Sequence, residues 1–527
     1  MDYHDDAGVT WFGNIEITMN TQSENNVLSF PSSVLVLGLG ETGLAAALWC
    51  LRNQARLRIA DTRTNPPGLD KLDATGLPFE KFLGERSFDD EALEGIDAIV
   101  LSPGLVPSEP QLAGFLARAE QRNIEILGEV ELFSRALLQL RQTQAYEPKV
   151  LGITGTNGKT TVTTMIRDML QEAGLVAVAA GNISPSALTA LMAALDANAL
   201  PDVWVLELSS FQLVTVKTLQ PDASVVLNIT QDHLDWHANL QEYADCKAKL
   251  LKMSRVAVIN RDDEMVSAMV AFADDLNVRS FGETEPVLDG DMGLEDSNGM
   301  LWLAASSADE FDLPETGGRR KKSTERPVRK QGVLKRLMPA DAMLVRGRHN
   351  ALNALAAMAL CRVLGIGWTP LLNALRNYVA EPHRTNFVRS IRGVDFINDS
   401  KGTNVGSTVA ALKGMGRKVV LIAGGLGKGQ DFSPLVTPVA RFARAVVLIG
   451  QDARVIEQAL APAGVPCLHA VSLEEAVSIA LDHAQETDVV LLSPACASMD
   501  MFKNYNHRGN AFIDAVNELA LENGEVA

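Results

Sequence analysis

The chain has 527 residues, of which 47% are hydrophobic. This length is too great for one ordinary core and predicts about three domains. Its net charge of −18, from 47 Lys and Arg against 65 Asp and Glu, argues against general nucleic-acid binding because phosphate backbones would repel it. The five cysteines have no metal-ligand spacing, and neither a signal peptide nor an apolar run of membrane-spanning length is visible, so we expect a reduced cytoplasmic protein.

After a polar, unpatterned stretch over 1–29, which predicts a loose extension, the chain has the pattern of a dinucleotide-binding fold. Residues 33–53 predict a strand, a GxGxxG loop and an apolar-faced helix, and a second strand over 55–61 ends in an aspartate. A further strand over 97–104 ends in Ser-Pro-Gly, where the carboxyl end of a parallel strand would meet a ligand. A short strand is expected within 124–133. Taken literally, this fingerprint indicates an NAD-dependent enzyme, although any nucleotide diphosphate can lie on such a loop.

A second phosphate-binding pattern, GITGTNGKTT, follows a short apolar run and precedes a helical apolar pattern. Gly155 and Gly158 would let backbone N–H groups surround an anion, Lys159 would supply a point charge, and Thr160 could place a hydroxyl on Mg²⁺. The spacing departs from a strict Walker A motif, because Ile153 stands where that motif has glycine. A tight strand-to-helix turn with an incidental lysine is the alternative.

Acidic and histidine side chains follow the next buried strands of this central region. The strand in WVLELSSFQL ends at Glu207, and the loop after ASVVLNIT carries Asp232, His233 and Asp235. A single histidine in a loop is usually only solvated. Because these residues come just after strands that should lie beside the phosphate loop, we expect a cation site next to the phosphates.

The last part of the chain alternates strands and helices over 394–512 and predicts a second doubly wound α/β domain with glycine-rich loops. Just before it, EPHRTNF carries Arg384, whose guanidinium fork suits a phosphoryl group.

Five segments together resemble the Mur ligase family: TGTNGKTT, ELSSFQL, DHLDWH, NDSKGTNVGST and SPACASMDMFKNYNHRGNAF. The resemblance covers nearly the whole chain outside the N-terminal tail and a probable flexible insertion over 283–340. It implies an α/β protein of three domains: a Rossmann-like domain over 30–147 that binds a UDP-sugar, a P-loop ATPase-like parallel sheet over 148–380, and a Rossmann-like domain over 381–527 for the amino acid and ATP.

The resemblance also implies roles for individual residues. The implied ATP-binding residues are Gly155, Thr156, Asn157, Gly158, Lys159, Thr160, Thr161, Asn350, Asn353, Arg384, Asp399 and Lys401. The implied catalytic residues are Lys159, Glu207, His233, Lys247 and Arg384. Two Mg²⁺ ions are implied, with ligands from Thr160, Glu207, His233 and, if it is carbamylated, Lys247. Without the resemblance, Lys247 would be taken as a surface lysine and Asn350 equally as a helix cap.

For the other substrates, the implied UDP-sugar-binding residues are Gly40, Glu41, Thr42, Asp61, Thr62, Arg63, Ser102, Pro103, Gly104, Asn182 and His233. The implied amino-acid-binding residues are Thr403, Lys428, Ser498 and Tyr505. One lysine and hydroxyl groups suit an anionic amino acid, and the front domain resembles that of the D-glutamate-adding member. Two positions depart from family patterns: Leu426 where some members have Asp, and Tyr505 in place of Phe.

The expected function is an ATP-dependent amide ligase that adds D-glutamate to UDP-N-acetylmuramoyl-L-alanine through an acyl phosphate, in cytoplasmic peptidoglycan precursor synthesis. By family analogy we expect a monomer. Because three substrates come from three lobes, we also expect the last domain to close onto the centre about a hinge near 380–384. Another Mur-type ligase, a folylpolyglutamate-synthase-type ligase and a non-catalytic nucleotide sensor are the alternatives. The basic run over 317–336 is expected to be a solvated loop, with a docking patch for an acidic partner or membrane surface as its alternative.

Overall fold

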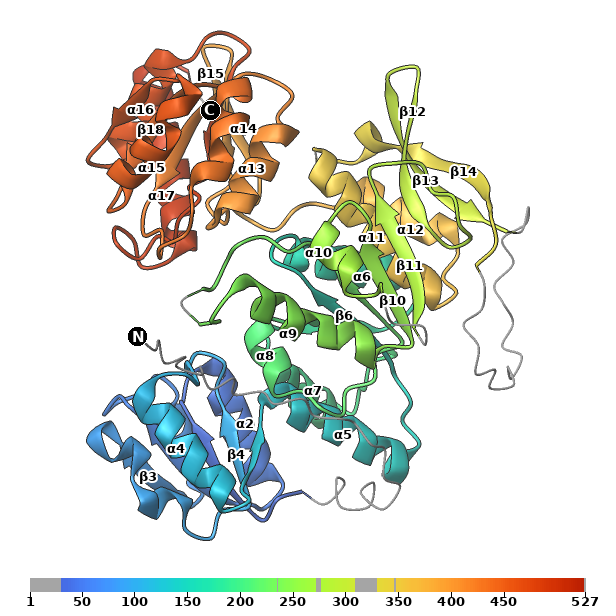
Figure 1. Ribbon diagram of the computed structural model, residues 1–527, viewed down its shortest axis with the longest axis vertical. Coiled ribbons are helices and arrows are strands. Elements are labelled where there is room, and N and C mark those ends of the chain that lie inside the picture. Colours follow the sequence, from blue (N-terminus) through green and yellow to red (C-terminus); the bar gives the residue numbers. More distant parts are fainter. Residues whose placement is uncertain (1–29, 235, 272–275, 309–328, 346, 526–527) are drawn as a thin grey trace, which may run out of the picture.

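The computed structural model describes residues 30–234, 236–271, 276–308, 329–345 and 347–525. Its described strands form three sheets, of five, nine and six strands, which follow one another along the chain. Figure 1 shows the corresponding lobes in blue, green to yellow, and orange to red, with the central lobe between the other two. The α/β fold class and the three-domain organisation predicted from the sequence are therefore confirmed. Among the described helices, none combines the length and apolar character that a bilayer crossing needs.

The first sheet is parallel throughout and has the order β3-β2-β1-β4-β5. Its strands are β1 (Ser33–Leu37), β2 (Arg56–Asp61), β3 (Glu80–Leu83), β4 (Ala98–Leu101) and β5 (Glu125–Leu127). Its main helices are α2 (Glu41–Arg52), α4 (Pro110–Gln121) and α5 (Glu129–Gln144). The expected strand within 124–133 is therefore cut short, because Val130, Phe133 and Leu137 begin a helical apolar face that α5 buries.

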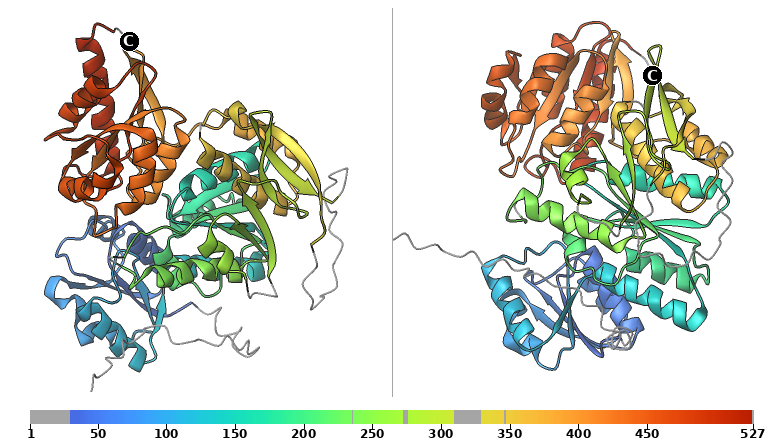
Figure 2. Two further views of the ribbon diagram at one scale, coloured as in Figure 1. Left: turned by 45° about the horizontal axis from the view of Figure 1, so that its top comes forward. Right: turned by 45° about the vertical axis from the view of Figure 1, so that its right-hand side comes forward.

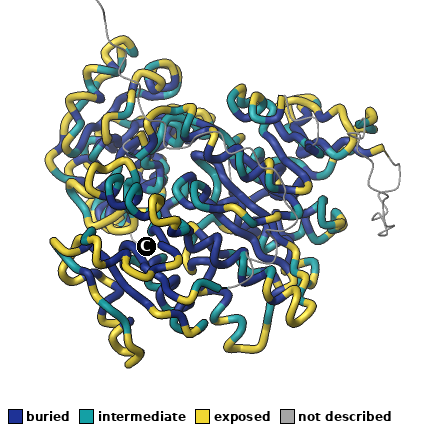
Figure 3. The backbone as a smooth tube through the Cα atoms, turned by 60° about the horizontal axis from the view of Figure 1, so that its bottom comes forward, coloured by how far each residue is buried: buried dark blue, intermediate teal, exposed yellow. Residues whose placement is uncertain are grey.

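The central sheet has the order β14-β13-β12-β11-β10-β9-β6-β8-β7, parallel from β7 to β12 and antiparallel beyond. Its parallel strands are β6 (Lys149–Thr154), β7 (Ala177–Gly181), β8 (Val203–Glu207), β9 (Ala223–Val226), β10 (Val256–Asn260), β11 (Asn277–Gly282) and β12 (Met292–Ser297). The helices are α6 (Lys159–Glu172), α7 (Ala187–Asp196), α8 (Ser210–Val214), α9 (Leu240–Met253), α10 (Glu264–Ala268), α11 (Arg348–Val363) and α12 (Trp368–Asn377). In Figure 3 long stretches of the backbone are buried, and the central strands β6, β8 and β9 are buried along nearly their whole length.

The segment 283–340, for which a flexible insertion is expected, contains ordered strands. β12, β13 (Met300–Ser307) and β14 (Val333–Pro339) extend the central sheet as antiparallel neighbours. They form because alternate residues, Met292 and Leu294 on one strand and Leu303 on the next, enter the same core as α11. Residues 309–328, which hold most of the basic run, lie outside the described residues.

The last sheet has the order β15-β16-β20-β17-β18-β19, with only β15 antiparallel to its neighbour. Its strands are β15 (Asn386–Ile391), β16 (Val394–Asn398), β17 (Val419–Gly424), β18 (Ala443–Ile449), β19 (Cys467–His469) and β20 (Val489–Leu492). The helices are α13 (Val405–Gly414), α14 (Val436–Phe442), α15 (Ala453–Leu460), α16 (Leu473–His483) and α17 (Tyr505–Glu522). Separate apolar clusters cover its two faces, as expected for a doubly wound sheet.

The first and central domains share one apolar core. Val34 and Phe133 from the first domain belong to the same buried cluster as Leu188 and Trp204 from the central domain. Phe133 and Trp204 pack edge to face with ring centroids 5.1 Å apart. Figure 2 shows the last domain as a separate lobe beside the central domain. Hydrogen bonds between polar groups join the two, from Asn157 to Asn404, from Asn404 to Asp232 and from the Asp431 amide to Gln231. The first two domains therefore form one packed unit, against which the last domain is more free to move.

A buried carboxyl group at this junction gives a prediction about stability. Burial raises the pKa of Glu129 from 4.5 to about 7, although the Leu188 amide donates to it. Because the folded-state pKa is the higher one, ionisation destabilises the fold increasingly as pH rises from 4.5 to about 7. Glu129→Gln should therefore stabilise the protein at about pH 8, by up to about 3 kcal/mol, and the gain should shrink towards pH 5.

Thermal unfolding at the two pH values measures this effect. Glu131→Gln on the same helix is the matched control, because both oxygens of Glu131 are used: Arg135 donates to one, and the Lys217 and Thr218 amides donate to the other. That substitution should destabilise the protein at both pH values. A destabilised Glu129→Gln variant at pH 8 would contradict the assignment of a strained buried carboxylate.

Candidate functional site

The glycine loop between β6 and α6 has the backbone geometry that the sequence predicts for a phosphate site. Gly158 precedes α6 with a φ of 85°, and Gly155 has a φ of 150°. A Cβ atom at Gly158 would lie 2.6 Å from the Asn353 carboxamide oxygen, and one at Gly155 would lie 2.9 Å from the Leu227 Cβ. Both positions therefore require glycine, and the amides at the start of α6 stay open to an anion.

Lys159 places its ammonium over this loop. Its Nζ donates to the carbonyl oxygens of Gly155, at 2.9 Å, and Thr156, at 2.8 Å. Desolvation lowers the pKa of Lys159, while the nearby carboxylates of Glu207 and Asp232 act in the opposite direction. The Lys159 ammonium thus lies where an outer phosphate would contact it, and two carboxylates are close enough to raise its pKa.

Behind the loop lie residues that the sequence analysis did not single out. The Asn157 amide donates to Asn228 Oδ1 at 2.8 Å, and Asn228 Nδ2 donates back to the Asn157 carbonyl at 3.1 Å. Tyr243 donates its hydroxyl to Thr156 Oγ1 at 3.1 Å. Asn228 lies two residues after the end of β9, so a polar residue just past a buried strand was the signal available for it. These contacts hold the loop before any ligand arrives.

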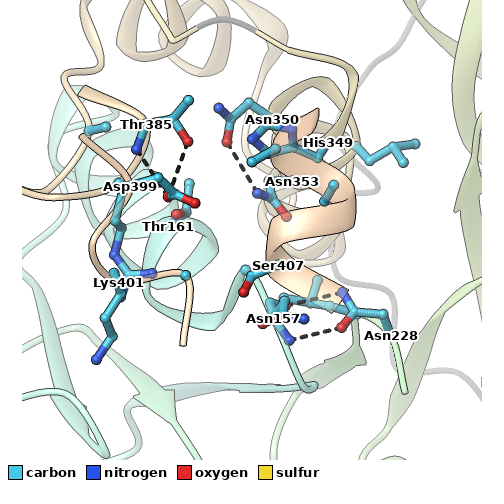
Figure 4. Close-up of a pocket in the computed structure, with 18 of the residues that line it drawn as sticks. Asn157, Thr161, Asn228, His349, Asn350, Asn353, Thr385, Asp399, Lys401 and Ser407 are labelled. Atoms are coloured by element: carbon cyan, nitrogen blue, oxygen red, sulfur yellow. Dashed lines mark hydrogen bonds between the residues drawn. The ribbon is translucent and has the colours of Figure 1, made fainter. Parts of the chain in front are cut away.

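A cleft of about 160 Å³ lies between this loop and the last domain, and Figure 4 shows residues that line it. Eight of the residues predicted for ATP line the cleft: Asn157, Gly158, Thr161, Asn350, Asn353, Arg384, Asp399 and Lys401. They come from the central domain, from the linker after α12 and from the loop after β16. Residues separated by more than two hundred positions in the sequence therefore form one concave site.

On the side of the last domain, the cleft carries a buried acid among cations. Asp399 Oδ2 accepts from Ser493 at 2.7 Å, and its Oδ1 accepts from the Thr385 amide at 3.2 Å. Burial raises the pKa of Asp399 to about 6, whereas the neighbouring Arg384 lowers it. Lys401 lies 3.8 Å from the centre of the Tyr505 ring, and burial, followed by Arg384, lowers its pKa to about 8.

The start of α11 forms the opposite wall. Gly347 is the N-cap of α11, so the alternative interpretation of Asn350 as the helix cap is wrong. Asn350 instead lies in the first turn, where its Oδ1 accepts from Asn353 Nδ2 at 3.3 Å. Both carboxamides border the cleft beside His349, which the sequence analysis did not identify, and burial lowers the pKa of His349 to about 4. This wall is therefore polar but uncharged.

Glu207 ends β8 as predicted and lies close to the phosphate loop. Its Oε1 accepts from Asn182 Nδ2 at 2.8 Å, while its Oε2 is buried and has no hydrogen-bond partner among the described residues. A buried carboxylate oxygen without a partner fits a site for a cation. The predicted metal ligand and the predicted substrate residue Asn182 are thus in direct contact.

Lys247 is buried, so its interpretation as a surface lysine is wrong. Its side chain is on the inner face of α9, only 1% of the residue is exposed, and its Nζ donates to Thr154 Oγ1 at 3.2 Å. The ammonium also lies 4.6 Å from the Tyr243 ring centre. Burial and then the charge of Lys159 lower the pKa of Lys247 well below its usual value. An ammonium here is unfavourable, so the site favours the neutral amine.

His233 has a positive φ of 55° and packs edge-on against Phe211, with ring centroids 4.7 Å apart. Its Nε2 is 3.7 Å from Asp232 Oδ2. In the part of the chain that the structure describes, no three His, Cys, Asp or Glu side chains form a group that could hold a metal ion. Glu207 and His233 alone would therefore leave a metal without enough protein ligands of these types.

In the first domain, Asp61 supports the glycine loop. Asp61 is 4% exposed, its Oδ2 accepts from the Leu39 amide at 2.7 Å, and Arg63 donates to both of its oxygens. Although burial raises the pKa of Asp61, the hydrogen bonds from Arg63 and from the backbone amides hold it below its usual value. Both oxygens of this carboxylate already accept hydrogen bonds from the protein. Asp61 is therefore not placed to accept from a ribose hydroxyl, as the NAD interpretation requires.

Most of the other predicted UDP-sugar residues lie just after β1, β2 and β4, which are neighbouring parallel strands, and Glu41 and Thr42 begin α2. Asn182 and His233 instead belong to the central domain, where they follow β7 and β9. Ser102 Oγ donates to the Gly38 carbonyl at 2.7 Å and so ties two of these loops together. The central domain reaches the same edge, because Ser184 donates to Glu41 at 2.8 Å and Trp236 donates to the Leu105 carbonyl at 3.1 Å. This edge is therefore continuous with the loop that carries His233.

The predicted amino-acid residues lie after β16, β17 and β20, again neighbouring parallel strands, and at the start of α17. The two loops that carry Lys428 and Ser498 are paired through reciprocal backbone hydrogen bonds between Leu426 and Ala497, at 2.9 and 3.0 Å. Arg508, which the sequence analysis missed, is buried and donates to the Ser400 and Cys496 carbonyls. Arg508 therefore holds the NDSKG loop against the loop after β20.

Comparisons with family models match all three domains. The model of the Mur ligase MurD-like N-terminal domain matches residues 32–128, that of the Mur ligase middle domain matches 153–361, and that of the Mur ligase glutamate ligase domain matches 383–496. Together they cover most of the chain, with one model for each of the three sheets.

Comparisons with curated proteins and solved structures agree. The UDP-N-acetylmuramoylalanine–D-glutamate ligase of Bordetella avium is 60% identical over 94% of this chain and 97% of its own length. The protein of that name from Burkholderia cenocepacia is 52% identical over 93% and 98%. Among solved structures, UDP-N-acetylmuramate-alanine ligase of Thermotoga maritima (18% identity, TM-score 0.52, 93% and 100% of the two chains) and MurF of Acinetobacter baumannii (17%, 0.53, 81% and 92%) share the fold.

Proposed function

The chain belongs to the Mur ligase family, and on this premise we propose that it adds D-glutamate to UDP-N-acetylmuramoyl-L-alanine at the expense of ATP, in cytoplasmic peptidoglycan precursor synthesis. The observation that carries the proposal is the cleft in which the Lys159 loop faces Arg384, Asp399 and Lys401 across a domain junction. Relatives at 52–60% identity that bear the D-glutamate ligase name support the choice of substrates.

In the first step, the terminal carboxylate of the UDP-sugar attacks the γ-phosphorus of ATP. The new O–P bond gives an acyl phosphate, the bond to the β-phosphate breaks, and ADP leaves with its electron pair. Lys159 and Arg384 offset the charge that would otherwise keep a carboxylate and a triphosphate apart. Burial in the cleft strengthens these interactions because water is excluded.

In the second step, the amine of D-glutamate attacks the acyl carbon, phosphate leaves, and the amine loses a proton. Thr403, Lys428, Ser498 and Tyr505 are our proposed contacts for the amino acid, since they lie on loops at one edge of the last sheet. Holding the amine near the acyl phosphate supplies much of the rate enhancement. The UDP group would bind to the loops after β1, β2 and β4. Binding at this end would fix the position of the long substrate and of the carboxylate at its other end.

We propose that Thr160, Glu207, His233 and a carbamylated Lys247 would hold Mg²⁺. The unpartnered oxygen of Glu207 and the buried position of Lys247 fit this assignment. When bound, Mg²⁺ neutralises phosphate charge. The number of ions, two in our proposal, follows the family resemblance, as does the monomeric state, which light scattering on the purified protein would test.

Phosphate release from ATP, measured against a panel of UDP-sugars and of D- and L-amino acids, tests the proposal. We expect turnover only with UDP-N-acetylmuramoyl-L-alanine and D-glutamate together. Turnover with a folate and L-glutamate would favour the folylpolyglutamate-synthase alternative, and nucleotide binding without any product would favour a sensor.

Closure of the last domain gives another prediction. The linker residues His383 and Thr385 have positive φ values of 65° and 55°, so the backbone turns sharply on either side of Arg384. We propose that residues 380–384 act as the hinge. Small-angle X-ray scattering should show a smaller radius of gyration with an ATP analogue and UDP-sugar than without them. An unchanged scattering curve at saturating ligands would count against closure.

A further inference from the structure

Asn404, at the N-cap of α13, joins the last domain to the central domain. The residue is 5% exposed, and its carboxamide pairs reciprocally with that of Asn157 in the phosphate loop: Asn404 Nδ2 donates to Asn157 Oδ1 at 3.0 Å, and Asn157 Nδ2 donates to Asn404 Oδ1 at 3.2 Å. Asn404 Nδ2 also donates to Asp232 Oδ2 at 3.0 Å. Its Oδ1 also accepts from the Ser407 amide at 2.9 Å, and this hydrogen bond caps α13.

These four hydrogen bonds use the whole capacity of a carboxamide, which has two N–H donors and one oxygen with two lone pairs. An aspartate could cap α13 equally well but would offer no donor and would face the carboxylate of Asp232. A serine could cap the helix but would be too short to reach both partners. The position therefore needs asparagine for contacts beyond the cap.

The two partners of Asn404 in the central domain are both parts of the site. The peptide of Asn157 is held by Asn228 on its other side, so Asn404 completes the clamp on the phosphate loop. Asp232 directly precedes His233, and its Oδ1 accepts from the His233 amide at 2.9 Å. A fourth hydrogen bond across the same junction, from the Asp431 amide to Gln231 Oε1 at 3.3 Å, involves the residue just before Asp232.

We propose that Asn404 is a positioning residue that couples the docking of the last domain to the alignment of the phosphate loop and of the Asp232–His233 turn. Docking holds the loop in place, and by the reciprocity of linked equilibria an ordered, ATP-filled loop favours docking. The proposal deepens the proposed function, because it assigns the contact by which the last domain is seated before phosphoryl transfer.

The experiment uses substitutions that keep the helix cap. Asn404→Ser retains a capping oxygen but removes the amide pair, and Asn404→Asp additionally sets a carboxylate against Asp232. We expect kcat to fall on the order of 10²-fold for Asn404→Ser and further for Asn404→Asp, with a raised KM for ATP. The compaction seen by scattering on addition of an ATP analogue should be reduced, whereas UDP-sugar affinity should not change.

A reciprocal swap provides the rescue. The double variant Asn404→Asp with Asp232→Asn again places an amide donor opposite a carboxylate. Its kcat should therefore be at least about tenfold higher than that of Asn404→Asp alone, and the compaction should return. Gln430→Ala is the matched control, because Gln430 accepts from the Val405 amide at the same helix start and donates to the Ala495 carbonyl, both within the last domain. Its compaction should stay normal.

Two outcomes would overturn the proposal: Asn404→Ser with normal kcat and normal compaction, or Asn404→Ser whose thermal midpoint and UDP-sugar affinity fall together, as for a merely structural residue. The test is separable from the proposed function, because compaction with an ATP analogue needs no amino acid. Should the wild type compact and the Asn404 variants fail to do so, while no D-glutamate product forms, the positioning role would stand and the ligase assignment would fall.

Discussion

Replacing Lys159 by alanine should lower turnover on the order of 10³-fold or more while leaving the affinity for the UDP-sugar intact. The ammonium of Lys159 lies on the phosphate loop, and Glu207 and Asp232 are close enough to act on its pKa. The loops after β1, β2 and β4, which we assign to the UDP group, belong to another sheet. Loss of the lysine should therefore remove charge compensation for the phosphoryl group without disturbing the sugar nucleotide.

Steady-state phosphate release and calorimetric titration with the UDP-sugar measure the two halves of this prediction. Lys149→Ala is a suitable control, because Lys149 begins β6, the strand that leads into the phosphate loop, but is exposed and paired with Asp222 at 3.3 Å. That variant should turn over normally. Near-normal rates for Lys159→Ala would mean that the assignment of the ATP loop is wrong.

The parts of the site that could be predicted from the sequence are those in which local chemistry determines position. A glycine loop between a buried strand and a helix requires particular backbone angles, so Gly155 and Gly158 were recognisable without any tertiary information. Likewise, a polar residue directly after a buried parallel strand must appear at the carboxyl edge of the sheet. Glu207 is placed in this way, and so is the Asp399 loop.

The rest depends on contacts between distant segments. Asn228 and Asn404 hold the phosphate loop from two domains. In the sequence, however, Asn228 is only a polar residue after a strand, and Asn404 is only a polar residue before a helix. The hydrogen bond from the Leu39 amide to Asp61 also became visible only in the folded structure, because the dinucleotide-binding fingerprint alone suggests that Asp61 contacts a ligand.

The strands β12–β14 were missed for a related reason. Their period-2 pattern is short, and its burial depends on α11, which follows them in the chain. Sequence charge also misled the interpretation of the segment: Arg336 pairs with both oxygens of Glu295 on β12, so part of the basic run balances an acid within the sheet. Local composition does not reveal such a partner.

Substitution of Lys247 should have the second largest effect. Lys247→Arg keeps a positive charge but cannot form a carbamate, and we expect turnover to fall on the order of 10²-fold or more. The structural reason is that an ammonium at this buried position donates to the Thr154 hydroxyl, lies over the Tyr243 ring and is disfavoured by burial and by the charge of Lys159. Attack of the neutral amine on CO₂, with loss of a proton, would instead give an anion whose oxygens could face a cation.

Lys252 on the exposed side of α9 supplies the matched control, and Lys252→Arg should leave turnover unchanged. After equilibration with ¹³C-bicarbonate, the wild type should give a carbamate carbon signal by NMR that Lys247→Arg lacks. Removal of CO₂ should lower the activity of the wild type reversibly. A fully active Lys247→Arg variant would show that turnover needs no carbamate at this buried position.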